Sequence, residues 1–300
     1  MSVIENAIKM LHAKRAAEAQ ARDGVFASVR TGTGPARLAE KAFPAAPPAR
    51  PARVIVIDQV ALRSAGLLPP EHQERELAQQ YRQIKRPLIN KAFGRGVAPI
   101  ERGNIIMIAS AMAGEGKTFI SLNLAFSIRL EEDASVLLMD GDVANPRISR
   151  LLGVADEKGI LDVLQDPSID VESVILPTDV PGLSLLPAGR RADNATELLA
   201  SARMTELVTG LAGGSSSRIV LFDSPPLLLT TESHALAQLA GQIVLVVRAD
   251  QTPQSAVLEA IDKIQEEKSV ALILNQSLRA ASAGYYYGEG SVSQEGASKA

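Results

Sequence analysis

Glycine, lysine and threonine lie close together in the segment ASAMAGEGKT, residues 109–118. Gly114 and Gly116 let the backbone come close to a ligand, so that successive N–H groups can point at phosphate oxygens. Lys117 can reach the β and γ phosphates of a nucleotide, and the Thr118 hydroxyl can bind Mg²⁺. The spacing is that of a phosphate-binding P-loop except at the first glycine, where this chain has Ala111.

We therefore expect this segment and the residue after it to bind ATP together with Mg²⁺. The residues expected to contact the nucleotide here are Ala113, Gly114, Glu115, Gly116, Lys117, Thr118 and Phe119.

Three aspartates follow apolar runs elsewhere in the chain. Asp140 and Asp142 come after VLLM, and Asp223 comes after IVLF. A single aspartate after a strand is usually a cap or turn residue, but three of them at the edge where a P-loop begins indicate a metal–phosphate site. We expect Asp142, Asp223 and Thr118 to lie on the metal side of this site. We expect Asp140 to orient an attacking hydroxyl or water, and Lys117 to complete the catalytic set.

A parallel sheet would bring these residues together. The run 105–108 is apolar and suits a buried strand, and a long apolar helix follows from Lys117. Strand signals then alternate with helical segments, which predicts an α/β fold with a doubly wound, mostly parallel sheet. The further strands are expected at 135–142, 183–189, 218–226, 242–250 and 269–276, with helical pieces near 147–152 and 159–165.

Three local patterns carry further expectations. RVIVI, residues 53–57, could form a short strand, and 71–93 reads as a charged helix broken near Pro87. The helix is locally basic because it carries four basic residues. The default interpretation of this run is a solvated helix face, and the alternative is a surface for self-association. The four basic residues are Arg82, Lys85, Arg86 and Lys91. Asn194 and Glu197 have the N-cap and N3 spacing of a helix start.

Composition bounds the class of protein. The 300 residues are 46% hydrophobic, without tryptophan, so the core must be aliphatic. The formal net charge of −3 gives no attraction to nucleic acid. There are no cysteines, so disulfides and Cys-ligated zinc are excluded. No apolar run approaches the ~20 residues of a membrane-spanning helix, and the charged N-terminus does not look like a secretory signal, so we expect the chain to be cytoplasmic.

Both ends of the chain differ from the middle. Residues 1–22 look like a helix with a narrow apolar stripe, either a solvated helix or one that meets a membrane surface or a partner. Residues 31–52 are rich in proline and alanine and read as a linker. We expect three parts: the N-terminal helix and linker 1–52, a P-loop domain 53–276, and a disordered tail 277–300 that carries tyrosines.

Two motifs and the tail take the interpretation further. VLLMDGDVANPR resembles the second Walker motif, A′, of the bacterial tyrosine kinases, and IVLFDSPP resembles their Walker B motif. The family has a P-loop fold related to the ParA and MinD ATPases, and its members usually end in a tyrosine-rich tail. This chain has GYYYGEG, with Tyr285, Tyr286 and Tyr287. The resemblance spans about residues 53–290. YRQIKRPLI and LLPAGRR…NATELL look most similar to autokinases encoded with exopolysaccharide and exosortase systems.

The resemblance implies an ATP-dependent protein-tyrosine autokinase that phosphorylates its own tail and regulates exopolysaccharide synthesis or export. It also implies a homo-oligomer, and a membrane-embedded polysaccharide co-polymerase or chain-length protein as activator. Such a partner would hold the chain at the inner face of the cell membrane.

The chain departs from the family pattern at several positions. Ala144 stands where an arginine is common, and Arg147 is a candidate substitute. The oligomerisation motif Glu-x-x-Arg-x-x-Arg would correspond here to Gln79, Arg82 and Lys85. Met112 replaces the additional lysine of the ParA and MinD proteins, which argues against a partitioning ATPase.

Several alternatives stay open from the sequence. The chain could be a ParA/MinD-like ATPase that positions a cargo, or a non-catalytic nucleotide-binding scaffold. The tail tyrosines could belong to a mere spacer. Asn275 could read the adenine edge or cap a turn, and Arg190 and Arg191 could contact phosphate or be surface charges.

Overall fold

The computed structural model describes residues 53–214, 217–264 and 267–277. The predicted N-terminal part, 1–52, lies outside the described residues, and so does the tyrosine cluster in the tail. The proposed boundaries of the three parts stay predictions.

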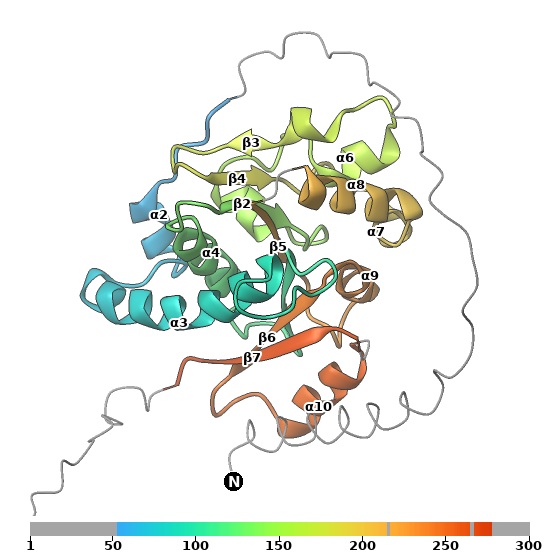
Figure 1. Cartoon of the computed structure of the whole chain (residues 1–300). Helices are drawn as coiled ribbons and strands as arrows, with labels where there is room; N and C mark the ends of the chain where they lie inside the picture. Colours follow the sequence, from blue (N-terminus) through green and yellow to red (C-terminus); the bar gives the residue numbers. More distant parts are fainter. Residues whose placement is uncertain (1–52, 215–216, 265–266, 278–300) are drawn as a thin grey trace, which may run out of the picture.

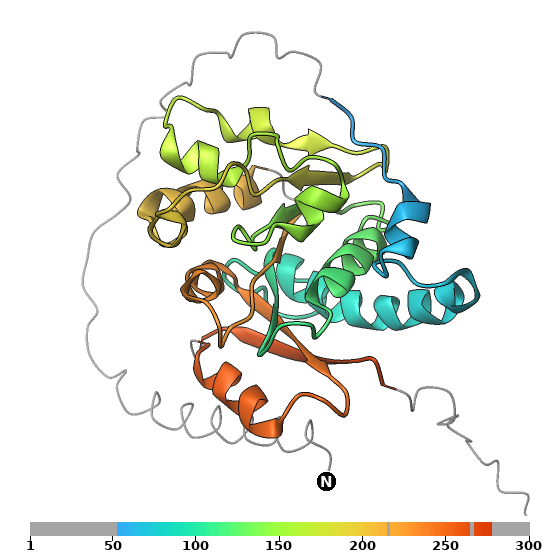
Figure 2. The same cartoon turned by 180° about the vertical axis from the view of Figure 1, so that it is seen from behind.

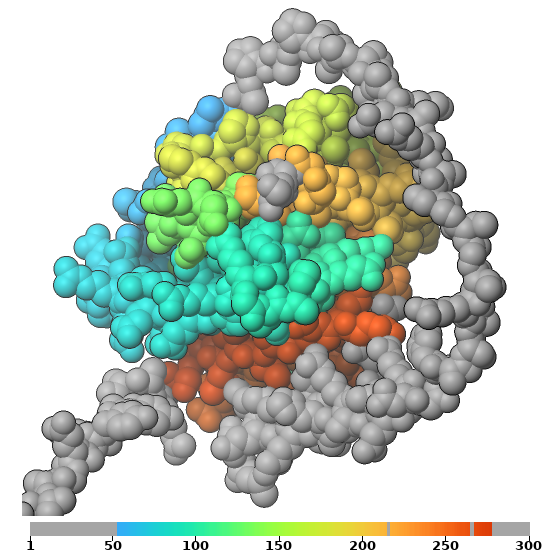
Figure 3. Space-filling model, in the orientation of Figure 1, coloured from blue at the N-terminus to red at the C-terminus, as the bar shows by residue number. Residues whose placement is uncertain are grey.

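A seven-stranded sheet runs through the described residues, in the order β3-β4-β2-β5-β1-β6-β7 (Figure 1). All neighbouring pairs are parallel except β3 with β4. The strands are β1 (Ile105–Ser110), β2 (Ser135–Asp140), β3 (Leu176–Pro177), β4 (Leu183–Leu186), β5 (Arg218–Asp223), β6 (Gln242–Arg248) and β7 (Ser269–Asn275). The mostly parallel sheet that the alternating pattern predicts is confirmed. In the space-filling view, the cyan segment before β1 lies across the molecule, between yellow-green and orange residues above it and the orange-red end of the described chain below it (Figure 3).

Helices cover both faces of the sheet (Figures 1 and 2). Buried side chains of α2 (Gln59–Ser64), α3 (Glu74–Phe93), α4 (Lys117–Ile128) and α5 (Arg147–Leu151) pack on one face. The other face is covered by α6 (Ile160–Gln165), α7 (Ala195–Leu199), α8 (Ala202–Gly213), α9 (Thr231–Leu239) and α10 (Gln254–Asp262). Within the described ranges, no helix is both long and apolar enough to cross a bilayer.

The register of the central strands brings the site together. Asp140, the last residue of β2, is directly opposite Asp223, the last residue of β5. Ile108 of β1 is opposite Asp223 on the other side, two residues before β1 ends at Ser110. The P-loop and the aspartates therefore lie at the same edge of the sheet, as a parallel sheet requires.

The helix α4 begins at Lys117, inside the P-loop motif itself. It lies between the sheet and α3, and its apolar side chains are buried against both. Its N-cap is Gly116, whose φ of 98° is in the left-handed region that favours glycine. Because α4 is held by the core on two sides, the residues at its N-terminus that are expected to bind phosphate are fixed in position.

Two predictions near the N-terminal side of the domain are wrong. Residues 53–57 do not form a strand; only Ile55 makes an isolated parallel bridge, with Thr178. The helix at 71–93 is not broken near Pro87, because α3 continues through that residue to Phe93 after the short 3₁₀ turn η1 (Glu71–Gln73). Buried residues lie on both sides of the proline, including Tyr81 and Ile89, so packing outweighs the helix bond that proline removes.

The basic surface expected on this helix is only partly solvated. The Lys85 side chain is 5% exposed, and its Nζ lies 2.6 Å from Glu131 Oε1 and donates to the carbonyl oxygen of Ser127 at 2.7 Å. Lys85 is thus a buried connection between α3 and the end of α4. By contrast, the neighbouring Arg86 is exposed.

The helix expected from Asn194 onward is two helices. Asn194 is the N-cap residue of α7, but its side chain makes no capping hydrogen bond. α7 ends at Leu199, and α8 begins again at Ala202. Ser201 caps α8, because its hydroxyl accepts from the Met204 N–H at 3.2 Å.

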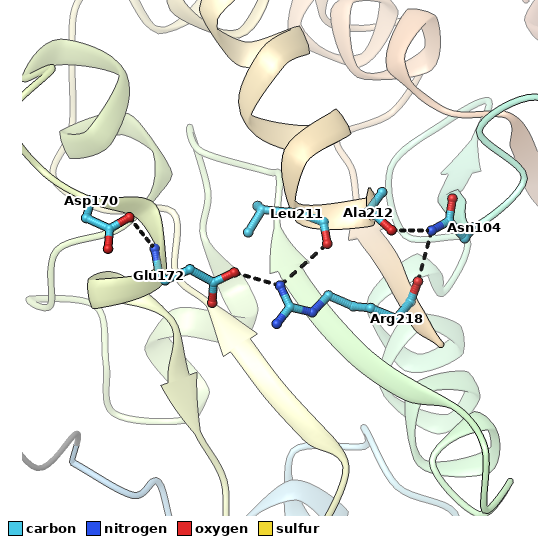
Figure 4. A network of polar contacts seen from close by, with 6 residues as sticks. All are labelled: Asn104, Asp170, Glu172, Leu211, Ala212 and Arg218. Carbon is cyan, nitrogen blue, oxygen red and sulfur yellow. Dashed lines mark hydrogen bonds and ion pairs between the residues drawn. The ribbon is translucent and has the colours of Figure 1, made fainter. Parts of the chain in front are cut away.

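A polar network joins several elements at the end of the sheet where β5 begins, opposite the P-loop (Figure 4). Arg218 Nη1 donates to Glu172 Oε1 at 2.9 Å and lies 3.5 Å from the Leu211 carbonyl oxygen. The Asn104 side-chain amide donates to the carbonyl oxygens of Ala212 and Arg218. Glu172 lies in the 3₁₀ turn η2 (Val171–Val174). The network ties this turn, the end of α8 and the starts of β1 and β5 together, away from the P-loop.

The buried Lys85 gives the first prediction. Replacing it with alanine leaves Glu131 without its partner and opens a gap between α3 and α4, so the free energy of unfolding should fall by about 1–3 kcal/mol. Urea unfolding followed by circular dichroism measures this change. The matched control is Arg86→Ala, which should change stability by less than about 0.5 kcal/mol. Equal effects of the two substitutions would contradict the assigned role of Lys85.

Candidate functional site

Asp223 is a fully buried carboxylate at the centre of the site. Its Oδ2 accepts from the Thr118 hydroxyl at 2.8 Å, and its Oδ1 lies 2.9 Å from Ser121 Oγ. Burial raises the pKa of Asp223 to about 6, although the two hydroxyls and the charge of Lys117 act in the opposite direction. Thr118 and Asp223, both expected at the metal, are therefore in direct contact.

Lys117 is buried at the start of α4. Its Nζ donates to Ser110 Oγ at 2.9 Å, and that hydroxyl donates to the Met112 carbonyl oxygen at 2.6 Å. Burial lowers the pKa of Lys117, while the charges of Asp223, Asp142 and Glu115 raise it. The ammonium group is thus held beside the loop by a hydroxyl and a field of carboxylates.

Asp140 combines burial with an unused acceptor. Its Oδ2 accepts from both the N–H and the hydroxyl of Ser149, each at 2.7 Å. Its Oδ1 is buried and has no hydrogen-bond partner among the residues that the structure describes. Burial, together with the charge of Asp223, raises the pKa of Asp140 to about 7, against the two hydrogen bonds from Ser149. Such a pKa suits a proton acceptor near neutral pH.

Asp142 is less buried than the other two aspartates. Its Oδ1 accepts from the Asn145 N–H at 3.1 Å. Burial raises the pKa of Asp142, and Glu232 adds to this effect, while the Asn145 N–H, Lys117 and Arg150 oppose it. Asp142 therefore lies in the electrostatic field of the P-loop lysine, and its expected place at the metal stays a prediction.

Gly141 lets these aspartates come together. Its N–H donates to the Asp223 carbonyl oxygen at 2.8 Å, so the end of β2 is bonded to the end of β5. A Cβ on Gly141 would lie 2.8 Å from Leu236 Cδ1 and 2.9 Å from the Asp223 carbonyl oxygen. Any side chain here would separate β2 from β5 and from α9, so the glycine between the two aspartates has a structural reason.

The P-loop backbone has the shape that its glycines predict. Gly114 has φ 80° and Gly116 has φ 98°, both in the left-handed region. Ala111, at the position of the missing first glycine, is fully buried and is not among the residues with positive φ. Its carbonyl oxygen accepts from the Leu228 N–H at 3.2 Å. Alanine is therefore compatible with the backbone at this position.

Asn275 lies against the P-loop. Its Nδ2 donates to the Glu115 carbonyl oxygen at 2.9 Å, and its Oδ1 accepts from the Gln276 N–H at 3.0 Å. A Cβ on Gly116 would lie 2.1 Å from this amide nitrogen, so the absence of a side chain lets Asn275 approach. The expected adenine contact of Asn275 stays a prediction, while its contact with the loop is present.

The arginines considered from the sequence are spread out. Arg190 Nε donates to Asp162 Oδ1 at 2.6 Å, an ion pair at the start of α6. Arg191 and Arg147 are exposed, the latter as the first residue of α5. Arg190 thus has a structural partner, and a phosphate contact by any of the three stays a hypothesis.

The carboxylates suit a Mg²⁺ ion that is shared with phosphates. Among residues 53–214, 217–264 and 267–277, no group of three or more His, Asp or Glu side chains could hold a metal ion alone. Mg²⁺ typically takes one or two carboxylates, phosphate oxygens and water. Asp223 and Thr118 in contact, with Asp142 near Lys117, fit that mode of binding.

Sequence reasoning missed several polar residues at this edge. Ser110 contacts Lys117, and Ser121 contacts Asp223. Ser121 could have been found, because it lies four residues after Lys117 on the same helix face. Glu232, whose Oε1 accepts from the Thr196 hydroxyl at 2.7 Å, joins the site only through long-range packing.

The raised pKa of Asp140 gives a prediction with a definite sign. Between the unfolded value of about 4 and the folded value of about 7, the folded protein binds more protons, so stability falls as pH rises through this window. Asp140→Asn removes that cost, because the amide stays uncharged at both pH values. Without nucleotide or Mg²⁺, the stability gain of the variant should be about 2–3 kcal/mol larger at pH 8 than at pH 5. Urea unfolding at both pH values tests this, and a gain independent of pH would contradict it.

Comparison with known proteins identifies the family. A family model described as ParA, NUBPL iron-transfer P-loop NTPase, matches residues 101–264. The tyrosine-protein kinase YwqD of Bacillus subtilis is 30% identical over 186 residues, which cover 61% of this chain and 77% of that protein. The tyrosine-protein kinase wzc of Salmonella typhimurium is 30% identical over 191 residues, 62% of this chain and 26% of that protein. The chain thus spans about a quarter of the length of wzc.

Solved structures agree with the sequence relatives. The kinase domain of the Escherichia coli tyrosine kinase ETK superposes with a TM-score of 0.59 at 26% identity, covering 70% of this chain and 80% of that one. The VpsO kinase domain gives a TM-score of 0.56 at 27% identity, covering 69% and 98%. From its fold, its P-loop edge and these relatives, the chain belongs to the ParA-type P-loop NTPases and, within them, to the bacterial tyrosine-protein kinases.

Proposed function

We propose that this chain is an ATP-dependent protein-tyrosine autokinase that phosphorylates Tyr285, Tyr286 and Tyr287 and so regulates exopolysaccharide synthesis or export. The observation that supports this most directly is Asp140, a buried carboxylate with a pKa of about 7 in register with Asp223 at the P-loop edge.

Positioning and charge would supply most of the catalysis. The P-loop amides and Lys117 would hold the β and γ phosphates of ATP. Thr118, Asp142 and Asp223 would hold the Mg²⁺ ion, which supplies positive charge to those phosphates. Burial of these groups strengthens their electrostatic interactions with the charge that develops on the transferred group.

Asp140 would act on the acceptor tyrosine. A tyrosine hydroxyl has an ordinary pKa of ~10, so it needs a nearby proton acceptor at neutral pH. The tyrosine oxygen would bond to the γ phosphorus as the bond to the bridging oxygen of ADP breaks. The hydroxyl proton would pass to Asp140 Oδ1, the oxygen that has no partner among the described residues.

Burial excludes the other tyrosine as an acceptor. The chain has four tyrosines, and Tyr81 on α3 is 4% exposed. Burial raises its pKa well above the ordinary value. Its hydroxyl is buried, and its side chain belongs to the core on the α4 side of the sheet, which supports the three tail tyrosines as the acceptors.

The cellular setting follows from the family. We propose that the chain acts as a homo-oligomer, with a membrane-embedded polysaccharide co-polymerase or chain-length protein as its activator. It would then work in the cytoplasm, at the inner face of the cell membrane. The relatives' names support the kinase activity, and the activator, the oligomer and the location are inferred from the family resemblance.

Removing the phosphate clamp tests the use of the P-loop. Lys117→Met should reduce tyrosine phosphorylation by at least about 100-fold, because the variant loses the charge that contacts the transferred phosphoryl group. Incorporation of labelled phosphate from ATP measures this. Lys263→Met, at the exposed end of α10, is the matched control and should behave as wild type. Wild-type labelling of the Lys117 variant would overturn the assignment.

Removing the acceptor hydroxyls tests the target. Changing Tyr285, Tyr286 and Tyr287 together to phenylalanine should abolish most phosphotyrosine and leave ATP affinity unchanged, because only the nucleophilic oxygens are deleted. Tyr81→Phe is the control and should keep full phosphorylation. Mass spectrometry and nucleotide titration measure both properties. Phosphotyrosine that persists in the triple variant would show that the acceptor lies elsewhere.

A further inference from the structure

Glu115 places a buried carboxylate inside the phosphate loop. The residue is 3% exposed. Its Oε2 accepts from the Met112 N–H at 2.7 Å, across the turn of the loop. Its Oε1 accepts from the hydroxyl of Thr252, which is 137 residues away in sequence. Both carboxylate oxygens are therefore engaged.

Thr252 belongs to the connection between β6 and α10. Its Oγ1 also accepts from the Arg248 N–H at 3.0 Å, at the end of β6. The Glu115 main chain has its own long-range partner, because its carbonyl oxygen accepts from Asn275 at the end of β7. One residue of the loop is thus bonded through its side chain to the end of β6 and through its backbone to the end of β7.

The charge of Glu115 would oppose the function of the loop. A carboxylate beside Lys117 repels the phosphates that the loop has to bind, and its burial costs free energy unless hydrogen bonds compensate. Any benefit of Glu115 to nucleotide binding must therefore come from geometry. Two hydrogen bonds from fixed groups can hold the loop in its binding shape before the nucleotide arrives, which lowers the cost of ordering it.

We propose that Glu115 is a positioning residue that ties the phosphate loop to the β6–α10 connection through Thr252, so that this connection sets the shape of the loop before nucleotide binds. The proposal rests on nucleotide binding at the P-loop and not on the transfer of phosphate to tyrosine.

Thr252 offers the sharper test, because the proposal gives it no contact with the nucleotide. Thr252→Val keeps the size and removes the hydroxyl, whereas Thr252→Ser keeps the hydroxyl. Fluorescence titration with Mg²⁺-ADP should show about 10–100-fold weaker binding for the valine variant, which loses one hydrogen bond to a charged group, and near wild-type binding for the serine variant.

Amide hydrogen exchange gives a readout without nucleotide. The Met112 N–H, bonded to Glu115, should exchange slowly in the nucleotide-free wild type. It should exchange faster in Glu115→Ala and in Thr252→Val, and remain slow in Thr252→Ser. Because this measurement needs neither ADP nor kinase activity, its result is separate from the fate of the proposed function.

A double-mutant cycle separates this connection from a local effect of Thr252 on Arg248. In the Glu115→Ala background, Thr252→Val should cause no further loss of Mg²⁺-ADP affinity. Additive losses of Mg²⁺-ADP affinity in the double variant would overturn the proposal. So would equal affinities of Thr252→Val and wild type, or equally weak binding by Thr252→Ser and Thr252→Val. Thermal unfolding of each variant identifies any that fails to fold. If Thr252→Val fails to fold, the exchange rate of the Met112 N–H is compared between Thr252→Ser and wild type, and faster exchange in Thr252→Ser would overturn the proposal.

Discussion

Negative charge is buried and concentrated at the edge of the sheet where the P-loop begins, and the surrounding structure has to compensate for it. Asp140 and Asp223 are adjacent in register, Asp142 follows closely, and burial raises the pKa of all three. One buried lysine, Lys117, offsets part of this charge. Such an arrangement costs stability in the free protein and favours ligands that bring positive charge. The Mg²⁺ ion that accompanies a nucleotide fits this requirement, whereas the negative phosphates would face Lys117 and the amides of the P-loop.

The scaffold holds these groups against their mutual repulsion. β2 and β5 are bonded along their whole length, and Gly141 allows their ends to approach as closely as the main chain permits. Helix α4 carries Lys117 and Thr118 and is packed between the sheet and α3. The buried Lys85 then fixes α3 to the far end of α4. The rigid core on both sides of α4 allows the unfavourable charges to persist.

Much of this fold could be predicted from local patterns. The continuous apolar runs of β1, β2, β5 and β6 identify buried parallel strands, and the aspartates that end β2 and β5 must then meet at one edge. The glycines of the P-loop predict its positive φ angles. In these cases the residue type alone determines the local geometry.

The sequence-based predictions that are wrong concern segments whose structure is determined by tertiary packing. RVIVI has strand propensity but reaches the sheet only at Ile55. Pro87 does not end α3, because side chains on both sides of the proline, such as Tyr81 and Ile89, are buried. Lys85 looks like a surface charge until its distant partner Glu131 is known. Thr252 and Glu232 belong to no motif, and they reach the site only through contacts between distant parts of the chain. Ser110 lies in the P-loop segment, but its residue type alone does not indicate its contact with Lys117.

If Asp140 takes part in phosphate transfer to the tail and not only in nucleotide binding, its replacement should affect transfer and spare binding. The most direct test is peptide mass spectrometry of dephosphorylated protein after incubation with Mg²⁺-ATP, for wild type and Asp140→Asn, with ATP affinity measured in parallel. We expect phosphate on the peptide with Tyr285, Tyr286 and Tyr287 in the wild type, and almost none in the Asp140→Asn protein, which should still bind ATP. Equal phosphorylation of that peptide in both proteins would contradict it.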